Sequence, residues 1–253
     1  MTVKSTRKRL DVLVVERGMA ESRQKAQAMI LAGEVSVDGS RAEKAGAAVP
    51  DSAHIEVHSR LQKYASRGGL KLEGALEDLG VAVSGKICLD IGSSTGGFTD
   101  CLLQHGAARV YAVDVNTNQL AWKVRDDRRV ERIRKNAREL RAGDLPEKAD
   151  LVVADVSFIS LTKILPGAVD CGNPSAEFLI LVKPQFELQR EDVGKRGIVR
   201  HPGLHDKAVA SVRAAAGSLG LVEIRVAPSR VIGAEGNQEF FLHARKTAKL
   251  ESR

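Results

Sequence analysis

The 253-residue chain is 28% charged and 43% hydrophobic, which is ordinary for a globular protein with one medium and one small domain. It has neither a signal-peptide pattern nor an apolar run of about 18 residues, so we expect a cytoplasmic protein without a membrane partner. The formal net charge of +7 indicates a polyanionic partner. Cys88, Cys101 and Cys171 lack the spacing of metal ligands, and we expect reduced thiols and no metal site.

Residues 1–59 are predicted to form a small α+β domain. Apolar residues recur at helical spacing from Leu10 to Val14, and again between the N-cap residue Ser22 and Gly33, which ends the second helix. Short alternating strands are expected at two further stretches, 35–37 and 55–57.

The pattern from Ser22-Arg23 through Gly33 to Asp38-Gly39 resembles the S4-type RNA-binding domain, whose two helices present basic side chains to structured RNA. Residues 1–33 contain seven Lys or Arg residues and three Asp or Glu residues. The resemblance implies RNA-binding roles for Arg7, Lys8, Arg9, Arg23 and Lys25. The alternative is a solvated basic face on a helical cap, because runs of charge commonly face water.

Residues 60–69 show little hydrophobic periodicity and end in a glycine pair. We interpret them as a linker and the entry to a second domain, residues 70–253. A helix is predicted at 70–79, where apolar residues recur at helical spacing and Gly80 follows. Lys71 falls in the first turn of this helix, where a cation opposes the helix dipole, so another role is expected to hold it there.

From Lys86 onward, strands alternate with helices, which is the pattern of a mostly parallel sheet covered on both faces. Strands are predicted at 86–91, 110–115, 130–134, 150–155, 177–183, 221–227 and 237–244. Helices are predicted at 97–105, 117–126, 160–169 and 204–219. The last connection is too short for a helix, so the last two strands should form an antiparallel hairpin. Ligands of such α/β sheets bind beyond the carboxyl ends of the strands.

A glycine-rich loop, Gly92-Ser93-Ser94-Thr95-Gly96-Gly97, follows the first of these strands. Its spacing differs from the G-x-G-x-x-G of dinucleotide-binding proteins, and no Gly-Lys-Ser/Thr follows to hold a triphosphate. Asp90 precedes the loop, where it would repel an anion and attract an ammonium or sulfonium group. Asp114 ends the next strand, where a carboxylate can accept both hydroxyls of a ribose. The alternative is a glycine turn with two solvent-facing acids.

An acid, a glycine loop and a second acid at the next strand tip resemble the first two motifs of class I (Rossmann-like) methyltransferases. The predicted seven-stranded sheet with a reversed last strand matches the fold of that class. The resemblance implies S-adenosylmethionine as the cofactor. The residues expected to bind it are Asp90, Gly92, Ser94, Gly96, Phe98, Asp114 and, near the adenine, Asn136.

Further charged residues fall at or near the ends of other strands, and Lys71 lies upstream in the predicted helix 70–79. In chain order, Lys71, Asp155, Lys183 and Glu239 resemble the tetrad of FtsJ-type ribose 2′-O-methyltransferases. The strings Ser66-Arg67-Gly68-Gly69, Asp155-Val156-Ser157-Phe158-Ile159-Ser160 and Val182-Lys183-Pro184-Gln185-Phe186-Glu187, together with the N-terminal module, are similar to the TlyA family specifically. The resemblance implies methylation of a cytidine ribose 2′-hydroxyl in ribosomal RNA, with these four residues catalytic and ribosomal RNA or ribosomal subunits as partner.

Lys183 is expected to lie nearest the 2′-oxygen, with Asp155 and Glu239 orienting it and Lys71 positioning substrate or tuning the site. A ribose hydroxyl is a poor nucleophile, so it must be oriented and relieved of its proton. Lys183 can accept that proton only when it is neutral. If it stays protonated, it stabilises the emerging alkoxide while water takes the proton. Both alternatives stand at this point.

Other classes of function are considered as well. A non-catalytic, ribosome-associated RNA-binding protein is disfavoured by the intact acids, glycines and tetrad. A membrane-lytic haemolysin, an activity described for members of this family, is disfavoured because no spanning segment or obvious amphipathic pore former occurs. The segment 123–141 holds nine Lys or Arg residues and four Asp or Glu residues. It either extends the RNA surface through phosphate contacts or is a solvated helix and strand edge.

Overall fold

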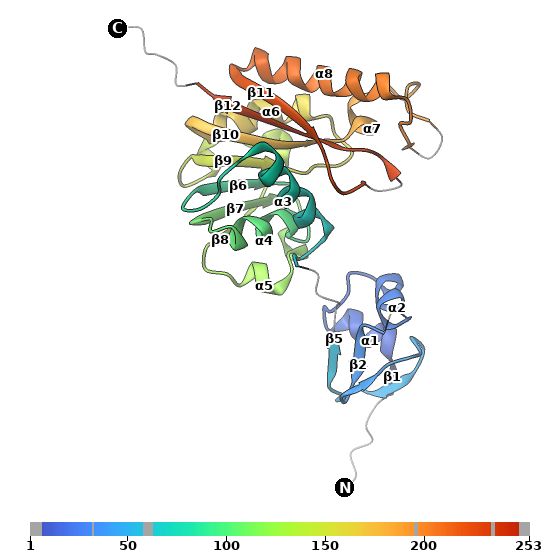
Figure 1. Cartoon of the computed structure of the whole chain (residues 1–253). Coiled ribbons are helices and arrows are strands. Elements are labelled where there is room, and N and C mark those ends of the chain that lie inside the picture. The colour runs from blue at the N-terminus through green and yellow to red at the C-terminus, as the bar shows by residue number, and fades with distance from the viewer. Residues whose placement is uncertain (1–6, 32, 58–62, 195–196, 234–235, 248–253) are drawn as a thin grey trace. The chain divides into compact units, whose positions relative to one another are not determined.

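The computed structural model describes residues 7–31, 33–57, 63–194, 197–233 and 236–247. The chain divides into two compact units, residues 1–62 and 63–253 (Figure 1). Each unit has a hydrophobic core of its own. Each is therefore described by itself.

The predicted linker, residues 60–69, is structured over much of its length. Tyr64 is only 1% exposed and belongs to the core of the second unit. The hydroxyl of Ser66 accepts a hydrogen bond from a first-turn amide and caps helix α3 (Arg67–Leu79). The helix thus begins three residues before its predicted start, because this N-cap outweighs the glycine pair. Residues 60–62 of the predicted linker lie outside the described residues.

The first unit packs two helices against short antiparallel strands. Its elements are β1 (Arg7–Arg9), α1 (Leu10–Glu16), α2 (Arg23–Leu31), β2 (Val35–Val37), β3 (Ser40–Arg41), β4 (Ala48–Pro50) and β5 (Ile55–Val57). Leu10, Leu13 and Ile30 are buried in its core, as their helical spacing predicts. Strand β1 was not predicted, because its three basic residues carry no apolar signal; it pairs with β4.

The second unit is built on a seven-stranded sheet with the order β11-β12-β10-β9-β6-β7-β8. The strands are β6 (Ile87–Ile91), β7 (Arg109–Asp114), β8 (Val130–Arg134), β9 (Ala149–Ala154), β10 (Gly172–Val182), β11 (Leu221–Pro228) and β12 (Phe240–Lys246). The pairs among β6 to β10 are parallel, whereas β12 runs antiparallel to both of its neighbours. The predicted fold class, including the final hairpin, is confirmed.

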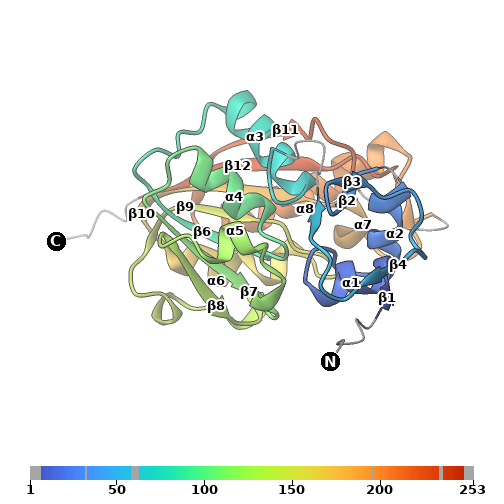
Figure 2. The same ribbon diagram turned by 90° about the horizontal axis from the view of Figure 1, so that it is seen from below.

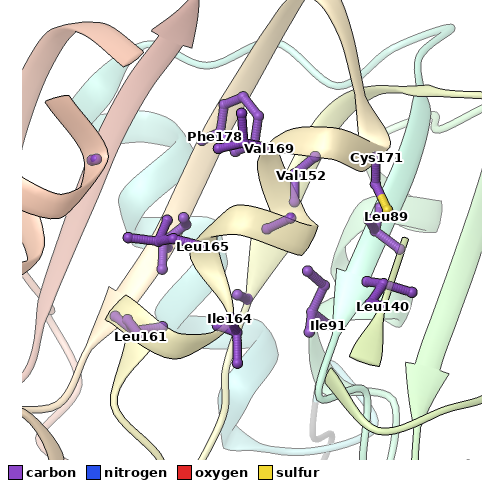
Figure 3. Packing of buried hydrophobic residues seen from close by; sticks show 14 of the residues in the cluster. Leu89, Ile91, Leu140, Val152, Leu161, Ile164, Leu165, Val169, Cys171 and Phe178 are labelled. Atoms are coloured by element: carbon purple, nitrogen blue, oxygen red, sulfur yellow. The ribbon is translucent and has the colours of Figure 1, made fainter. Parts of the chain in front are cut away.

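Helices cover both faces of this sheet (Figures 1 and 2). Besides α3, they are α4 (Gly97–Gln104), α5 (Trp122–Arg125), α6 (Leu165–Cys171), α7 (Pro184–Glu187) and α8 (Pro202–Ser218). Residues of α6 and α8 share one core cluster with alternate sheet residues, and residues of α3, α4 and α5 share the other. Figure 3 shows Leu89, Ile91 and Val152 of the sheet in one cluster with Leu165 and Cys171 of α6, and Leu89 lies beside Cys171. The alternation of strand side chains therefore turns Cys88 and Asp90 toward α4.

Two predicted helices are interrupted in the structure. The stretch 117–126 contains a 3₁₀ turn before α5, and 160–169 contains one before α6. The last strand begins at Phe240, after Glu239, and not at residue 237. Because β12 is antiparallel, its beginning lies at the edge of the sheet where β9 and β10 end. None of the helices in the described parts of the chain has the length and apolar character that a membrane crossing requires.

Candidate active site

A cavity of about 310 Å³ opens at the edge where β6, β9 and β10 end. Six parts of the chain line it: the start of α3, the loop after β6, the first turn of α4, the segment after β9, the residue after β10 and the residue before β12. The four side chains of the predicted tetrad all belong to its wall: Lys71, Asp155, Lys183 and Glu239.

The tetrad forms two ion pairs. Lys183 Nζ lies 2.6 Å from Asp155 Oδ1 and donates a hydrogen bond to Ser157 Oγ at 2.8 Å. Lys71 Nζ lies 2.5 Å from Glu239 Oε2. The side chains of both lysines are 11% exposed, so each ammonium reaches the cavity while its stem is buried. The pairs join residues from four separate elements at one site.

The sequence predicts Lys71 in the first turn of its helix, but the structure places it later. Helix α3 begins at Arg67, so Lys71 is its fifth residue. Lys71 therefore does not oppose the helix dipole, and its ammonium group is paired with Glu239. A Cβ on Gly233 would come within 2.2 Å of Glu239 Oε1, so the absence of a side chain there leaves room for the carboxylate.

The glycine loop approaches the neighbouring chain so closely that side chains would not fit. Gly92 has φ +85°, and a Cβ there would come within 2.4 Å of the Asp155 carbonyl oxygen. A Cβ on Gly97 would come within 2.2 Å of Ser66 Oγ. Gly96, with φ +90°, precedes the first residue of α4 and lies outside the cavity wall. Of the predicted cofactor residues, Gly92, Ser94 and Phe98 line the cavity.

Asp90 lies in β6, just before the glycine loop, as predicted, but its side chain does not line the cavity. It is completely buried, and its Oδ2 accepts a hydrogen bond from Thr99 Oγ1 of α4 at 2.6 Å. Burial raises the pKa of Asp90 to about 7. Strand alternation turns it toward α4, and the cavity wall does not include it.

Asp114 lies at the tip of β7 and holds the loop from the other side. Its Oδ2 accepts a hydrogen bond from the Ser94 amide at 2.9 Å, and its Oδ1 accepts one from the Asn116 amide at 2.9 Å. Ser94 itself has φ +46°, which is uncommon for a residue with a side chain. The carboxylate therefore supports the loop conformation, and it lies outside the wall of the 310 Å³ cavity.

Several wall residues were not predicted. Ser93 Oγ is buried and has no hydrogen-bond partner among the described residues, although Ser93 lines the cavity. Ser66, Arg67 and Gly68 also line it, although they were assigned to a linker. A signal for these three residues was present in the string Ser66 to Gly69, but its helix-capping role was missed.

A second cavity, of about 610 Å³, shares Ser157 with the first. Asn136, predicted near the adenine, lines this second cavity. So does Phe158, which is 91% exposed, has φ +64° and packs against Phe186 with ring centroids 5.2 Å apart. A left-handed backbone is uncommon at a residue with a side chain, and such residues cluster at functional sites.

The loop that carries Phe158 is tied down by Glu187. Its carboxylate accepts hydrogen bonds from Ser160 Oγ at 2.6 Å and from the Leu161 amide at 2.8 Å. Burial raises the pKa of Glu187. These bonds connect the segment after β9 to the end of α7, so they fix the loop between the two cavities.

Exposed arginines line the edge strand of the sheet. Arg132, Arg134 and Arg138 occur at alternate positions in and after β8. Among the described residues none of the three has an ion-pair partner, and Arg134 Nε donates to the Val115 carbonyl oxygen at 3.1 Å. This part of the segment 123–141 therefore presents positive charge to water.

The predicted RNA-binding residues of the first unit differ in their contacts. Arg7 donates to the Ala48 carbonyl oxygen at 2.9 Å, and Lys8 lies 2.7 Å from Glu16. Arg9 and Arg23 both contact the buried carboxylate of Asp11. The side chain of Lys25 has no ion-pair partner in the part of the chain that the structure describes.

Comparison with known proteins agrees with this architecture. The sequence profile of FtsJ-like methyltransferases matches residues 64–246, and that of the S4 domain matches residues 8–55. The Mycobacterium tuberculosis protein named 16S/23S rRNA (cytidine-2′-O)-methyltransferase TlyA is 46% identical over 94% of this chain and 90% of its own. Hemolysin A of Brachyspira hyodysenteriae is 44% identical over 93% of this chain and 98% of its own. A solved structure from Streptococcus thermophilus, described as a candidate hemolysin, has a TM-score of 0.73 with 41% identity and covers 96% of this chain and 90% of its own.

The sheet order, the glycine loop and the profile match define an FtsJ-like class I methyltransferase with an S4-type RNA-binding unit. S-adenosylmethionine is the cofactor of this class. The chain belongs to the TlyA family of ribosomal RNA 2′-O-methyltransferases.

The wall of the cavity fits that cofactor. The loop offers bare backbone where a Cβ would collide, and Ser93 Oγ is an orphan polar atom that a ligand can satisfy. Asp155 and Glu239 lie in the same wall, each paired with a lysine, so these four side chains together add no net charge to the site.

Proposed function

We propose that this protein transfers a methyl group from S-adenosylmethionine to the 2′-hydroxyl of a cytidine in ribosomal RNA. The observation that supports this most directly is the pair of Lys–carboxylate contacts in one cavity beside the glycine loop. The name of the relative from Mycobacterium tuberculosis supports the same substrate and position.

The cofactor residues follow from the cavity wall. When bound, S-adenosylmethionine supplies an electrophilic methyl group on a positively charged sulfur. The backbone of Gly92 and Gly97, the hydroxyl of Ser93 and the ring of Phe98 would hold it. Asp114, outside this wall, would accept ribose hydroxyls at the strand tip while keeping its bond to the loop. Asn136 lines the second cavity, so its contact with the adenine stays a prediction from the sequence.

Lys183 is the residue we assign nearest to the reacting 2′-oxygen. Its Nζ donates a hydrogen bond to Ser157 Oγ and lies 2.6 Å from Asp155 Oδ1. An ammonium in this place orients the hydroxyl and stabilises the negative charge that develops on the oxygen as its proton leaves to water. Asp155 holds the ammonium in place.

The second pair, Lys71 and Glu239, forms another part of the same wall. Glu239 is 2% exposed, so its charge is compensated mainly by Lys71. We assign this pair to positioning the ribose against Lys183.

The target base is proposed to occupy the second cavity. An exposed ring offers a stacking surface to an unstacked base, and Phe158 is held beside Ser157, which both cavities share. The exposed arginines of β8 would contact phosphates nearby. The base would thus be bound next to the site where its own ribose reacts.

The partner is ribosomal RNA, either free or within a ribosomal subunit, and the S4-type unit would contribute to its binding. No protein partner is inferred. Because ribosomal RNA is modified where ribosomes assemble, we infer a cytoplasmic location.

The test is transfer of labelled methyl from S-adenosylmethionine to purified small and large ribosomal subunits and to their deproteinised RNA. Wild type is compared with Lys183→Ala and with a control, Lys207→Ala, whose ion pair with Asp192 lies outside both cavities. We expect label on a ribose 2′-oxygen that is lost only in Lys183→Ala. Folded wild type that binds the cofactor and labels neither subunit nor RNA would refute the assignment. Label on a base would refute the proposed position.

A further inference from the structure

The first unit contains a carboxylate that is completely buried although it lies in a basic region. Asp11, in the first turn of α1, is 0% exposed. Its Oδ1 accepts from Arg9 Nε at 3.0 Å, and its Oδ2 accepts from Arg9 Nη2 at 2.9 Å. Its Oδ2 also accepts from Arg23 Nε at 2.9 Å and from Gln27 Nε2 at 2.8 Å. One carboxylate therefore joins β1, α1 and α2.

Arg9 and Arg23 contact Asp11 with part of each guanidinium group, and the rest of each side chain is exposed. Their side chains are 49% and 54% exposed, whereas the carboxylate between them has no exposed surface. In these contacts Arg9 uses two of its five N–H donors and Arg23 uses one. The remaining donors have no other partner among the described residues of this unit.

Asp11 is ionised in this arrangement. The hydrogen bonds from Arg9 outweigh the effect of burial and, with those from Gln27 and Arg23, hold the pKa of Asp11 well below its usual range. One negative charge thus faces two positive ones, and the cluster keeps a net positive charge that is directed outward.

The contact also fixes side chains that are otherwise flexible. A free arginine loses rotamer entropy when it binds, and a guanidinium that is already oriented loses less. Gly46 assists, because a Cβ there would come within 3.2 Å of Arg9 Nη1 and Nη2. The planar forks of two fixed guanidinium groups match the oxygens of a phosphate group.

We propose that Asp11 is a positioning residue that holds Arg9 and Arg23 as a preformed clamp for a phosphate of the RNA backbone. The inference rests on the proposed function in that RNA is the substrate. It adds that an acidic side chain increases the affinity for a polyanion, which is opposite to the effect of its charge alone.

This reversal of sign gives the test. Asp11→Asn removes one negative charge from the first unit, and so does the control Asp51→Asn, whose side chain is 45% exposed and lies 3.6 Å from Lys8. If charge alone decides, both variants bind ribosomal RNA more tightly than wild type. If Asp11 positions the arginines, Asp11→Asn binds about tenfold more weakly, whereas Asp51→Asn binds as tightly as wild type or more tightly.

Binding of deproteinised ribosomal RNA is measured over a series of salt concentrations, at temperatures where circular dichroism shows each variant folded. The slope of log K against log salt should decrease by about one to two for Asp11→Asn, because phosphate contacts are lost. Asp11→Asn is also added to the Arg9→Ala/Arg23→Ala variant, where we expect no further loss of affinity.

Equal affinities of Asp11→Asn and Asp51→Asn would overturn the proposal. The proposal would also be overturned if Asp11→Asn lowered the affinity for RNA as much in the Arg9→Ala/Arg23→Ala variant as in wild type. Asp11 would then act without the two arginines. Wild type that binds RNA but transfers no methyl group would refute the proposed reaction and leave the clamp to be judged by these affinities. Wild type that does not bind ribosomal RNA would refute both.

Discussion

Asp90 is the buried carboxyl group on which a pH experiment can test the structure. It has no exposed surface, its Oδ1 has no hydrogen-bond partner among the described residues, and only Thr99 Oγ1 donates to it from a side chain. The perturbation is Asp90→Asn, which keeps the size of the side chain and an acceptor for Thr99. It removes the carboxyl proton, and with it the ability to titrate.

The magnitude follows from the two protonation states. Burial raises the pKa of Asp90 from 3.8 to about 7. Below about pH 4 the carboxyl is neutral in both the folded and the unfolded chain. Between these two pKa values, the folded chain keeps the proton while the unfolded chain loses it. The free energy of unfolding therefore falls by about 1.4 kcal/mol for each pH unit, and it stops falling above about pH 7. Between pH 5 and pH 8 the wild type should lose about 3 kcal/mol through this group, as an upper estimate.

The assay is urea unfolding of wild type and Asp90→Asn at pH 5 and pH 8, followed by far-ultraviolet circular dichroism. The free energy of unfolding of the variant minus that of wild type should be larger at pH 8 than at pH 5 by up to about 3 kcal/mol, because only wild type loses stability over this range. Thr99→Val removes the donor that lowers this pKa, so its stability should continue to fall to a higher pH than that of wild type. Identical pH dependence of wild type and Asp90→Asn would refute the reasoning, because Asp90 would then ionise equally in both states.

Three further predictions concern methyl transfer. Phe158→Ala should reduce single-turnover transfer to ribosomal subunits by about tenfold or more without changing the melting temperature, because the lost stacking surface is 91% exposed; an unchanged rate would contradict a base-binding role. Gly233→Ala should place a Cβ against Glu239 and separate it from Lys71, so transfer should fall to the level of Glu239→Gln while the circular dichroism spectrum is retained; wild-type activity would show that the carboxylate can move freely. Lys183→Arg should retain more activity than Lys183→Ala, because arginine keeps a positive charge at all working pH values; equal loss in both variants would favour a neutral lysine that accepts the proton.

Local patterns in the sequence were sufficient for the elements of the sheet. The strand predicted at 130–134 agrees with β8, and that at 86–91 differs from β6 by one residue. The reason is that apolar alternation and turn residues act over a few neighbouring positions. Asp155, Lys183 and Glu239 fall at or near the ends of such strands, whereas Lys71 was selected through the resemblance to the FtsJ-type tetrad. The antiparallel direction of the last strand follows from a connection too short for a helix.

The tertiary structure decided what these residues contact. Lys71 and Glu239 are 168 positions apart and meet only because α3 packs beside the sheet and β12 runs antiparallel. Asp90 was expected to face a ligand, but the alternation of β6 turns it beneath α4, where burial governs its pKa.

The exposure of Phe158 likewise depends on a specific backbone conformation. Sequence by itself thus determined the order and kind of the elements, through interactions between near neighbours. Packing between segments far apart in the chain decided which side chains line one cavity, form an ion pair or lie in one layer of the core.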